Sequence, residues 1–198
     1  AEVTTTTAVP AAPSPLGVVE AFEAAFRSGD SGSLVALFSS DFISMNLTNG
    51  PTFADGERLG DYFEWLAVGN PRLELTGCEL NPGGRHVVLA TDIVRCDSSY
   101  TDDFFEIFEQ DYLFAGVIEF GVEDGLLRHI APLQDLDDPG LLLEVLEFFA
   151  WAEENRPEQW AQARDGDGSI IFTPESAATE LRLAREWAAT VRDTPGDS

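Results

Sequence analysis

The sequence predicts an α+β fold in which a curved, mainly antiparallel sheet wraps around N-terminal helices. The main observation is a late β-hairpin: residues 112–120 are apolar at even and odd positions, residues 123–125 (Glu-Asp-Gly) signal a turn, and residues 126–131 return with β-type content. A strand that is apolar on both sides must be covered on both faces, so residues 112–120 should be central. The second observation is that segments with helical periodicity precede and follow the strands.

The segments before this hairpin predict three helices and a strand. Val19, Phe22 and Phe26 fall on one face of a helix over residues 16–28, which ends at a Gly-Asp pair. The elements that follow are a short helix over residues 33–38, a strand over 41–47 and a helix over 59–68.

An earlier hairpin decides what we expect of the two cysteines. Residues 73–80 and 86–95 read as strands joined by a tight turn at residues 81–84. In that register Cys78 lies opposite residue 87 or 88, and Cys96 is too far along the partner strand to reach it. Either both thiols are free, or the predicted hairpin is wrong.

The last third of the chain predicts a helical extension. Residues 97–110 read equally as a strand extension or as an apolar lid. Asp138 and Pro139 are typical of a helix start, and a wide apolar stripe over residues 141–152 must be buried. A short helix from Pro157 and a longer helix from residue 174 follow. We therefore divide the chain into a Thr/Ala/Pro-rich disordered linker (1–15), an α+β domain (16–137) and a C-terminal helical extension (138–198).

The composition restricts the partners of the protein. Its 198 residues include 36 acidic residues and 11 basic residues, all Arg, for a formal net charge of -25. Such a surface repels nucleic acid and anionic membranes, and no apolar run approaches the ~20 residues that span a bilayer. We read the linker as the spacer left after a removed signal or lipoprotein peptide, which predicts a secreted or cell-surface protein. The alternative is a cytoplasmic protein of a salt-adapted host.

Four segments are typical of one fold family: residues 26–30 (FRSGD), 37–43 (LFSSDFI), 56–66 and 117–125 (VIEFGVEDG). Through them the chain from about residue 16 to 135 resembles the nuclear transport factor 2-like superfamily, which includes SnoaL-like proteins and ketosteroid isomerases. The resemblance implies a curved sheet that wraps three helices into a cone with an apolar pocket, often assembled as a homodimer.

The catalytic residues of that superfamily do not carry over. Matched by motif, the carboxylate base of the ketosteroid isomerases falls at Asn46, their tyrosine at Phe22 and their second acid near residues 116–117. None of these can take a proton or donate to a developing oxyanion. The Arg and Asp set of the related epoxide hydrolases is matched by Asp92 alone, with Ala131 in place of the second acid.

Asp92 and His129 remain as candidates for chemistry. Asp92 interrupts an apolar strand and shares a face with Val94, so in a pocket its pKa would rise and it could act as a base. His129 could be its acid or orienting partner, since imidazole titrates near neutrality. The alternative is a solubilising carboxylate and a structural histidine. Which applies depends on whether both side chains point into one cavity.

The predicted pocket is apolar and holds no metal or cofactor. Its candidate lining residues could equally fill it. Two histidines without ligand spacing do not indicate zinc. Residues 163–174 resemble a calcium loop but lack its first and twelfth carboxylates, so a Gly-rich turn is the better interpretation. The candidate pocket residues are Phe22, Phe26, Asn46, Tyr62, Trp65 and Tyr112.

The leading hypothesis is an exported domain that binds a small apolar ligand. The alternatives are a SnoaL-like isomerase, cyclase or dehydratase that uses the pair Asp92 and His129, and a protein interaction or scaffold module that uses the apolar helix over residues 141–152. We expect a possible homodimer, no nucleic acid and no membrane insertion. The extension should either close the pocket mouth or cover the outer face of the sheet.

Overall fold

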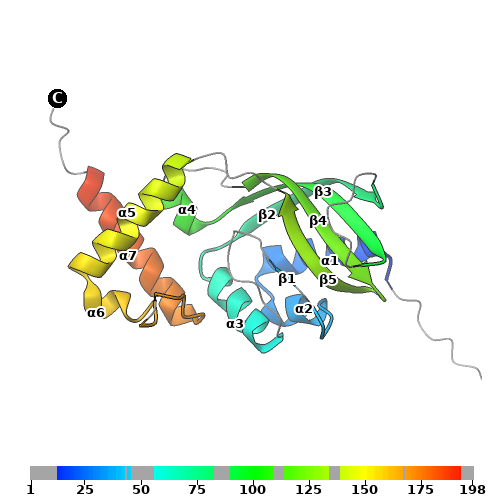
Figure 1. Cartoon of the computed structure of the whole chain (residues 1–198), viewed down its shortest axis with the longest axis horizontal. Coiled ribbons are helices and arrows are strands. Elements are labelled where there is room, and N and C mark those ends of the chain that lie inside the picture. The colour runs from blue at the N-terminus through cyan, green and yellow to red at the C-terminus, as the bar shows by residue number, and fades with distance from the viewer. Residues whose placement is uncertain are drawn as a thin grey trace, which may run out of the picture.

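A computed structural model describes residues 13–42, 44–45, 56–82, 90–108, 114–133, 139–166 and 168–192 of the chain (Figure 1). The first two thirds of the chain contain both helices and strands, and the described elements of the last third are all helices. The elements are α1 (Pro15–Ser28), α2 (Ser31–Ala36), β1 (Ser44–Met45), α3 (Gly56–Ala67), β2 (Arg72–Leu80), β3 (Asp92–Thr101), α4 (Asp103–Ile107), β4 (Phe114–Glu123), β5 (Leu126–Leu133), α5 (Pro139–Asn155), α6 (Pro157–Trp160) and α7 (Pro174–Arg192).

The predicted α+β fold is confirmed. The strands form one sheet in the order β1-β5-β4-β3-β2, in which β1 pairs with β5 in parallel and the other pairs are antiparallel. The hairpin of β4 and β5 turns at Asp124 and Gly125, whose φ angles of 52° and 78° favour Asp and Gly. The predicted central strand, β4, lies in the middle of this sheet.

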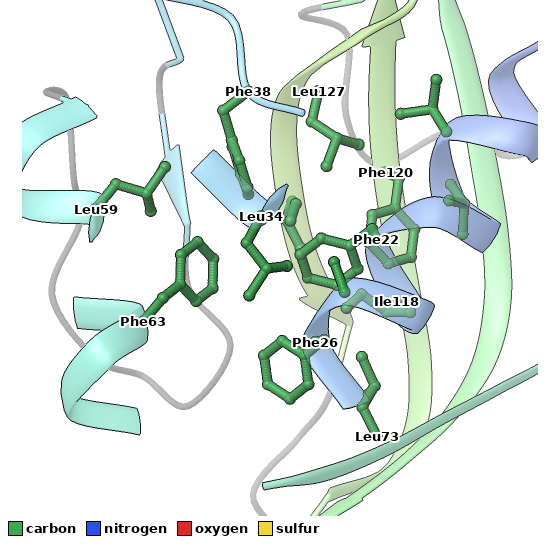
Figure 2. Packing of buried hydrophobic residues seen from close by; sticks show 14 of the residues in the cluster. Phe22, Phe26, Leu34, Phe38, Leu59, Phe63, Leu73, Ile118, Phe120 and Leu127 are labelled. Atoms are coloured by element: carbon green, nitrogen blue, oxygen red, sulfur yellow. The ribbon is translucent and has the colours of Figure 1, made fainter. Parts of the chain in front are cut away.

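The helices α1, α2 and α3 cover one face of the sheet, here called the inner face (Figure 1). Aromatic rings pack between the two layers: the Phe22 ring centroid lies 5.4 Å from that of Phe120 on β4 and 5.7 Å from that of Phe26 (Figure 2). Leu59 and Phe63 of α3 close the other side. The body of the cone, in this region, is packed ring against ring.

Of the two alternatives for the cysteines the second holds: Cys78 and Cys96 form a disulfide, and the predicted hairpin is wrong. Leu80 pairs with Val94, so the two strands are not joined by the tight turn at residues 81–84 that we expected. The same register pairs Glu79 with Arg95 and so places Cys78 opposite Cys96, and a β-bulge follows in β2 before Thr76 pairs with Asp97. The bond crosslinks the edge strand to its neighbour beneath α1.

Residues 97–101 extend β3, as one of the two readings of residues 97–110 expected, and the short helix α4 follows. Asp102 caps this helix, since its Oδ1 accepts a hydrogen bond from the backbone N of Phe105 at 2.9 Å. The cap directs Phe104 and Phe105 toward the C-terminal helices, with which both are packed.

The C-terminal helices form a second cluster, built on α5 and α7. Phe148 and Ala152 of α5 are fully buried against Leu183 and Ala184 of α7. Val145 and Phe149 of the predicted apolar stripe are half-buried and pack against this cluster, whereas Leu146 is 50% exposed.

The extension contacts the cone through α3 and α4 (Figure 1). In Figure 1 α5, α6 and α7 stand together at one end of the molecule, beside these two helices and away from β4 and β5. The described residues thus place the extension against α3 and α4, and not over the outer face of the sheet, which was one of the two placements we expected. No helix in the described part of the chain combines the length and apolarity needed to cross a bilayer.

Candidate functional site

Asp92 and His129 lie on opposite faces of the sheet, so the proposed catalytic pair is not formed. Asp92 pairs with Val122, a core residue of the inner face, whereas His129 pairs with Gly121 on the outer face. Cross-strand partners share a face and neighbours along a strand do not. Asp92 also lies at the sheet end, where its Oδ1 accepts a hydrogen bond from Asn81 Nδ2 at 3.0 Å.

His129 instead belongs to a polar group on the outer face. Glu119 is fully buried there and accepts a hydrogen bond from Arg95 Nε at 2.9 Å. Burial lowers the pKa of His129, and the charge of Glu119 acts in the opposite direction. Neither ring nitrogen of His129 has a hydrogen-bond partner among the described residues. Its burial therefore favours the uncharged imidazole.

The predicted pocket residues are divided between two places. Phe22, Phe26 and Tyr62 lie in the packed core of the cone. Trp65, one helical turn after Tyr62, lines a different cavity. Asn46 and Tyr112 lie outside the described residues.

That cavity lies where the extension meets the cone, and we call it the interface cavity. Its volume is about 280 Å³. One wall comes from the end of α3 and from the segment that joins β3 to α4, and the other comes from α5, α7 and the chain after α6. Its lining is mainly apolar and aromatic, with three charged side chains among the rings. The aromatic residues are Trp65, Tyr100, Phe104, Phe105 and Phe149, and the charged ones are Asp102, Arg164 and Glu180.

The start of α7 fixes which residues face the cavity. The Ser176 backbone N donates to Thr173 Oγ1 at 3.1 Å, and the Thr173 backbone N donates to Ser176 Oγ at 3.2 Å. This reciprocal cap sets the first turn of the helix. Residues three and four apart then share a face, which places Ala177, Glu180 and Leu181 together in the wall.

Arg164 and Glu180 form a buried ion pair in this wall. An Arg164 Nη2 hydrogen bond goes to Glu180 Oε1, and both side chains are buried. The guanidinium carbon of Arg164 lies 4.7 Å from the ring centroid of Phe149 and 5.1 Å from that of Trp160, which is cation–π geometry. Burial raises the pKa of Glu180, and Arg164 opposes this shift.

The second polar group of the cavity is a tyrosine and a carboxyl. The Tyr100 hydroxyl donates to Asp102 Oδ2 at 2.7 Å, and the other oxygen of Asp102 caps α4. Burial raises the pKa of both side chains. The charge of Asp102 also raises the pKa of Glu180, so the two carboxyls are close enough to interact.

Three buried polar atoms of the lining residues remain unpaired within the described part of the chain. They are Glu180 Oε2, Arg164 Nε and Trp65 Nε1. They amount to one unpaired acceptor and two unpaired donors on side chains that line the cavity.

Sequence reasoning missed Asp102, Arg164 and Glu180. A signal existed for Glu180, which falls on the apolar face of the last predicted helix, three residues after Ala177. A charged residue on such a stripe needs a buried partner. Nothing in the sequence indicated that Arg164 would be that partner.

Comparison with known proteins concerns the fold alone. No protein-family model matches the chain, and no curated protein is similar to it. Similar solved structures include a candidate polyketide cyclase from Pseudomonas putida, with 17% identity over 62% of this chain and 92% of that chain and a TM-score of 0.41. An LEH-like epoxide hydrolase from Mycobacterium tuberculosis has 18% identity over 57% of this chain and 76% of that chain and a TM-score of 0.38.

A protein of unknown function from Mycobacterium tuberculosis has 13% identity over 86% of this chain and 92% of that chain, with a TM-score of 0.44. We take no residue role from any of these structures.

Proposed function

We propose that the protein binds a small, mostly apolar molecule in the interface cavity. The observation that carries the proposal is the unpaired, buried Oε2 of Glu180 in a cavity with aromatic walls. Buried polar atoms nearly always have partners, and an unpaired one costs about 1–3 kcal/mol. A ligand that brings a polar group to Glu180 and an apolar body to the rings removes that cost.

The size of the cavity supports a small ligand. Its volume of about 280 Å³ lies just below the range of roughly 300–1,000 Å³ that is typical of drug-sized molecules. Because the cone and the extension each contribute a wall, a ligand that fills the cavity contacts both. Binding to the folded state alone should also raise the unfolding temperature.

Two adjacent alanines allow a matched test of this site. Ala177 is buried in the cavity wall, and Ala178 is exposed on the same helix. In Ala177→Phe the new ring occupies the cavity, while in Ala178→Phe the same ring points into solvent. We expect small aromatic compounds, screened by thermal shift and native mass spectrometry, to bind the wild type and Ala178→Phe but not Ala177→Phe. Equal binding to all three proteins would refute the proposal.

We also propose that the protein is exported. The disulfide between Cys78 and Cys96 supports this, because such bonds persist in oxidising compartments and are rare in the cytosol of mesophiles. The acidic, Lys-free composition is compatible with export and does not require it. The cellular compartment that holds the oxidised chain tests this proposal.

A further inference from the structure

We infer that the ligand of the interface cavity is a small primary amine, bound as its ammonium form, on a compact aromatic or alicyclic body. This inference rests on the proposed function and specifies the chemistry of its ligand. The ammonium group is placed at Glu180 and Asp102, and the apolar body is placed against the aromatic walls.

The balance of charge in the cavity favours a cation. Of the described residues that line it, the titratable ones are Tyr100, Asp102, Arg164 and Glu180. Arg164 is the only cation among these four, and it is paired with Glu180. When both carboxyls are ionised, one negative charge is left uncompensated in a buried space, which is costly. An ammonium ion neutralises that charge, whereas a carboxylate ligand would add a second one.

The arrangement of acceptors also suits an ammonium group. Glu180 Oε2 has no partner among the described residues, so it can accept one hydrogen bond directly. Asp102 accepts hydrogen bonds from the Tyr100 hydroxyl and the Phe105 backbone N, and a carboxylate has about four acceptor sites in all. A protonated primary amine has three donors to share between these two carboxyls.

Arg164 is poorly placed to bind an anionic ligand, because Glu180 and two aromatic rings already occupy its guanidinium group. Its Nη2 is bound to Glu180, and its guanidinium lies over the rings of Phe149 and Trp160. Its buried Nε lacks a partner in the described part of the chain. A bidentate contact with a ligand carboxylate, the usual strength of Arg in anion recognition, would require this set of contacts to be broken.

The aromatic walls contribute a second attraction for a cation. Trp65, Phe104 and Phe105 line the cavity, and the ring centroids of the two phenylalanines lie 5.4 Å apart in an edge-to-face arrangement. Ring faces attract cations, most strongly where water is excluded. The high net negative charge of the chain, -25 in total, also raises the local concentration of cations around it.

Proton linkage provides an independent readout. Burial raises the pKa of both Asp102 and Glu180. An ammonium ion binds best when these carboxyls are ionised, so its binding should release protons from those that are still protonated. The affinity for an amine should therefore rise as the pH increases through the raised pKa values, as long as the amine itself stays protonated.

The test compares three probes of similar shape on the full chain: benzylamine, benzyl alcohol and benzoate. Isothermal titration calorimetry at pH 7.5 should show benzylamine binding at least about tenfold more tightly than benzyl alcohol, and no binding of benzoate. Repeating the benzylamine titration in two buffers of different ionisation enthalpy should reveal the proton release.

Two isosteric variants separate the site from the fold. Glu180→Gln should reduce benzylamine affinity at least about tenfold and change that of benzyl alcohol less than about threefold, so the alcohol serves as the folding control. Glu186→Gln removes a carboxylate that pairs with Arg156 outside the cavity, and should leave both affinities unchanged.

Each result has a defined meaning. If benzyl alcohol or benzoate binds as tightly as benzylamine, or if Glu180→Gln keeps the preference for the amine, the inference is overturned while the cavity remains a binding site. If benzylamine does not bind, the inference is likewise overturned. If in addition Ala177→Phe has no effect on the binding of any small aromatic compound, the proposed function fails with it.

Discussion

Replacing Arg164 with methionine should destabilise the protein in a strongly pH-dependent way. Methionine keeps an apolar stem against Phe149 and Trp160 but leaves Glu180 as a buried carboxyl without its partner. Glu180 then avoids an unpaired charge by taking up a proton. The ordinary pKa of this carboxyl is 4.5, so pH 7 lies 2.5 units above it, and each unit corresponds to about 1.36 kcal/mol. Protonation at pH 7 therefore costs about 3.4 kcal/mol, which is an upper bound on the loss in the free energy of unfolding.

The direction of this pH dependence follows from the linkage between proton binding and folding. Glu180 has a raised pKa in the folded state, so its contribution to stability is greatest below the unfolded-state value and is lost as the pH rises. Removing Arg164 raises that pKa further, since Arg164 is the group that lowers it. The loss should therefore shrink to about 0.8 kcal/mol or less at pH 5, where protonation is nearly free.

Urea unfolding at pH 5 and pH 7 measures this difference directly. We expect the wild type and Arg164→Met to differ by up to about 3 kcal/mol at pH 7 and by less than about 1 kcal/mol at pH 5. The double variant Arg164→Met/Glu180→Gln, which has no charge to neutralise, should lose this dependence on pH. A loss of equal size at both pH values would refute the reasoning and assign the cost to packing.

Two further predictions concern the cysteines. The disulfide joins residues separated by 18 positions. For a loop of this length, removing the bond should lower the free energy of unfolding by about 3 kcal/mol and the melting temperature by about 6–12 °C. The bond can be removed by reduction or by the double replacement Cys78→Ala/Cys96→Ala. Identical melting curves with and without reductant would contradict this. In the source organism, fractionation with thiol alkylation before lysis should find the chain outside the cytoplasm with both cysteines blocked to the reagent, and a reduced cytoplasmic chain would disprove export.

The parts of the fold that were predicted correctly depend on local chemistry. The hairpin of β4 and β5 could be predicted because its turn needs residues that tolerate positive φ, and Asp124 and Gly125 supply them. The last helix could be placed because Thr173 and Pro174 are typical of a helix start. Such signals act over a few residues and do not depend on the rest of the chain.

The errors came from strand register. The pairing of Leu80 with Val94 places the turn beyond residues 81–84 and brings Cys78 opposite Cys96, and a one-residue change of register is enough to exchange the faces of a strand. The predicted pair of Asp92 and His129 failed for the same reason. The sequence does not specify which positions of different strands are neighbours or share a face.

The sequence by itself determined the fold class, the central hairpin and the acidic character. Only the tertiary structure decided that Phe22 and Phe26 pack together inside the cone and that the cavity lies beside it. Asp102, Arg164 and Glu180 come from three separate segments, and the docking of α7 against α3 and α4 brings them together. The physical reason is that a site built across an interface depends on how whole elements pack, which local patterns of residues do not encode.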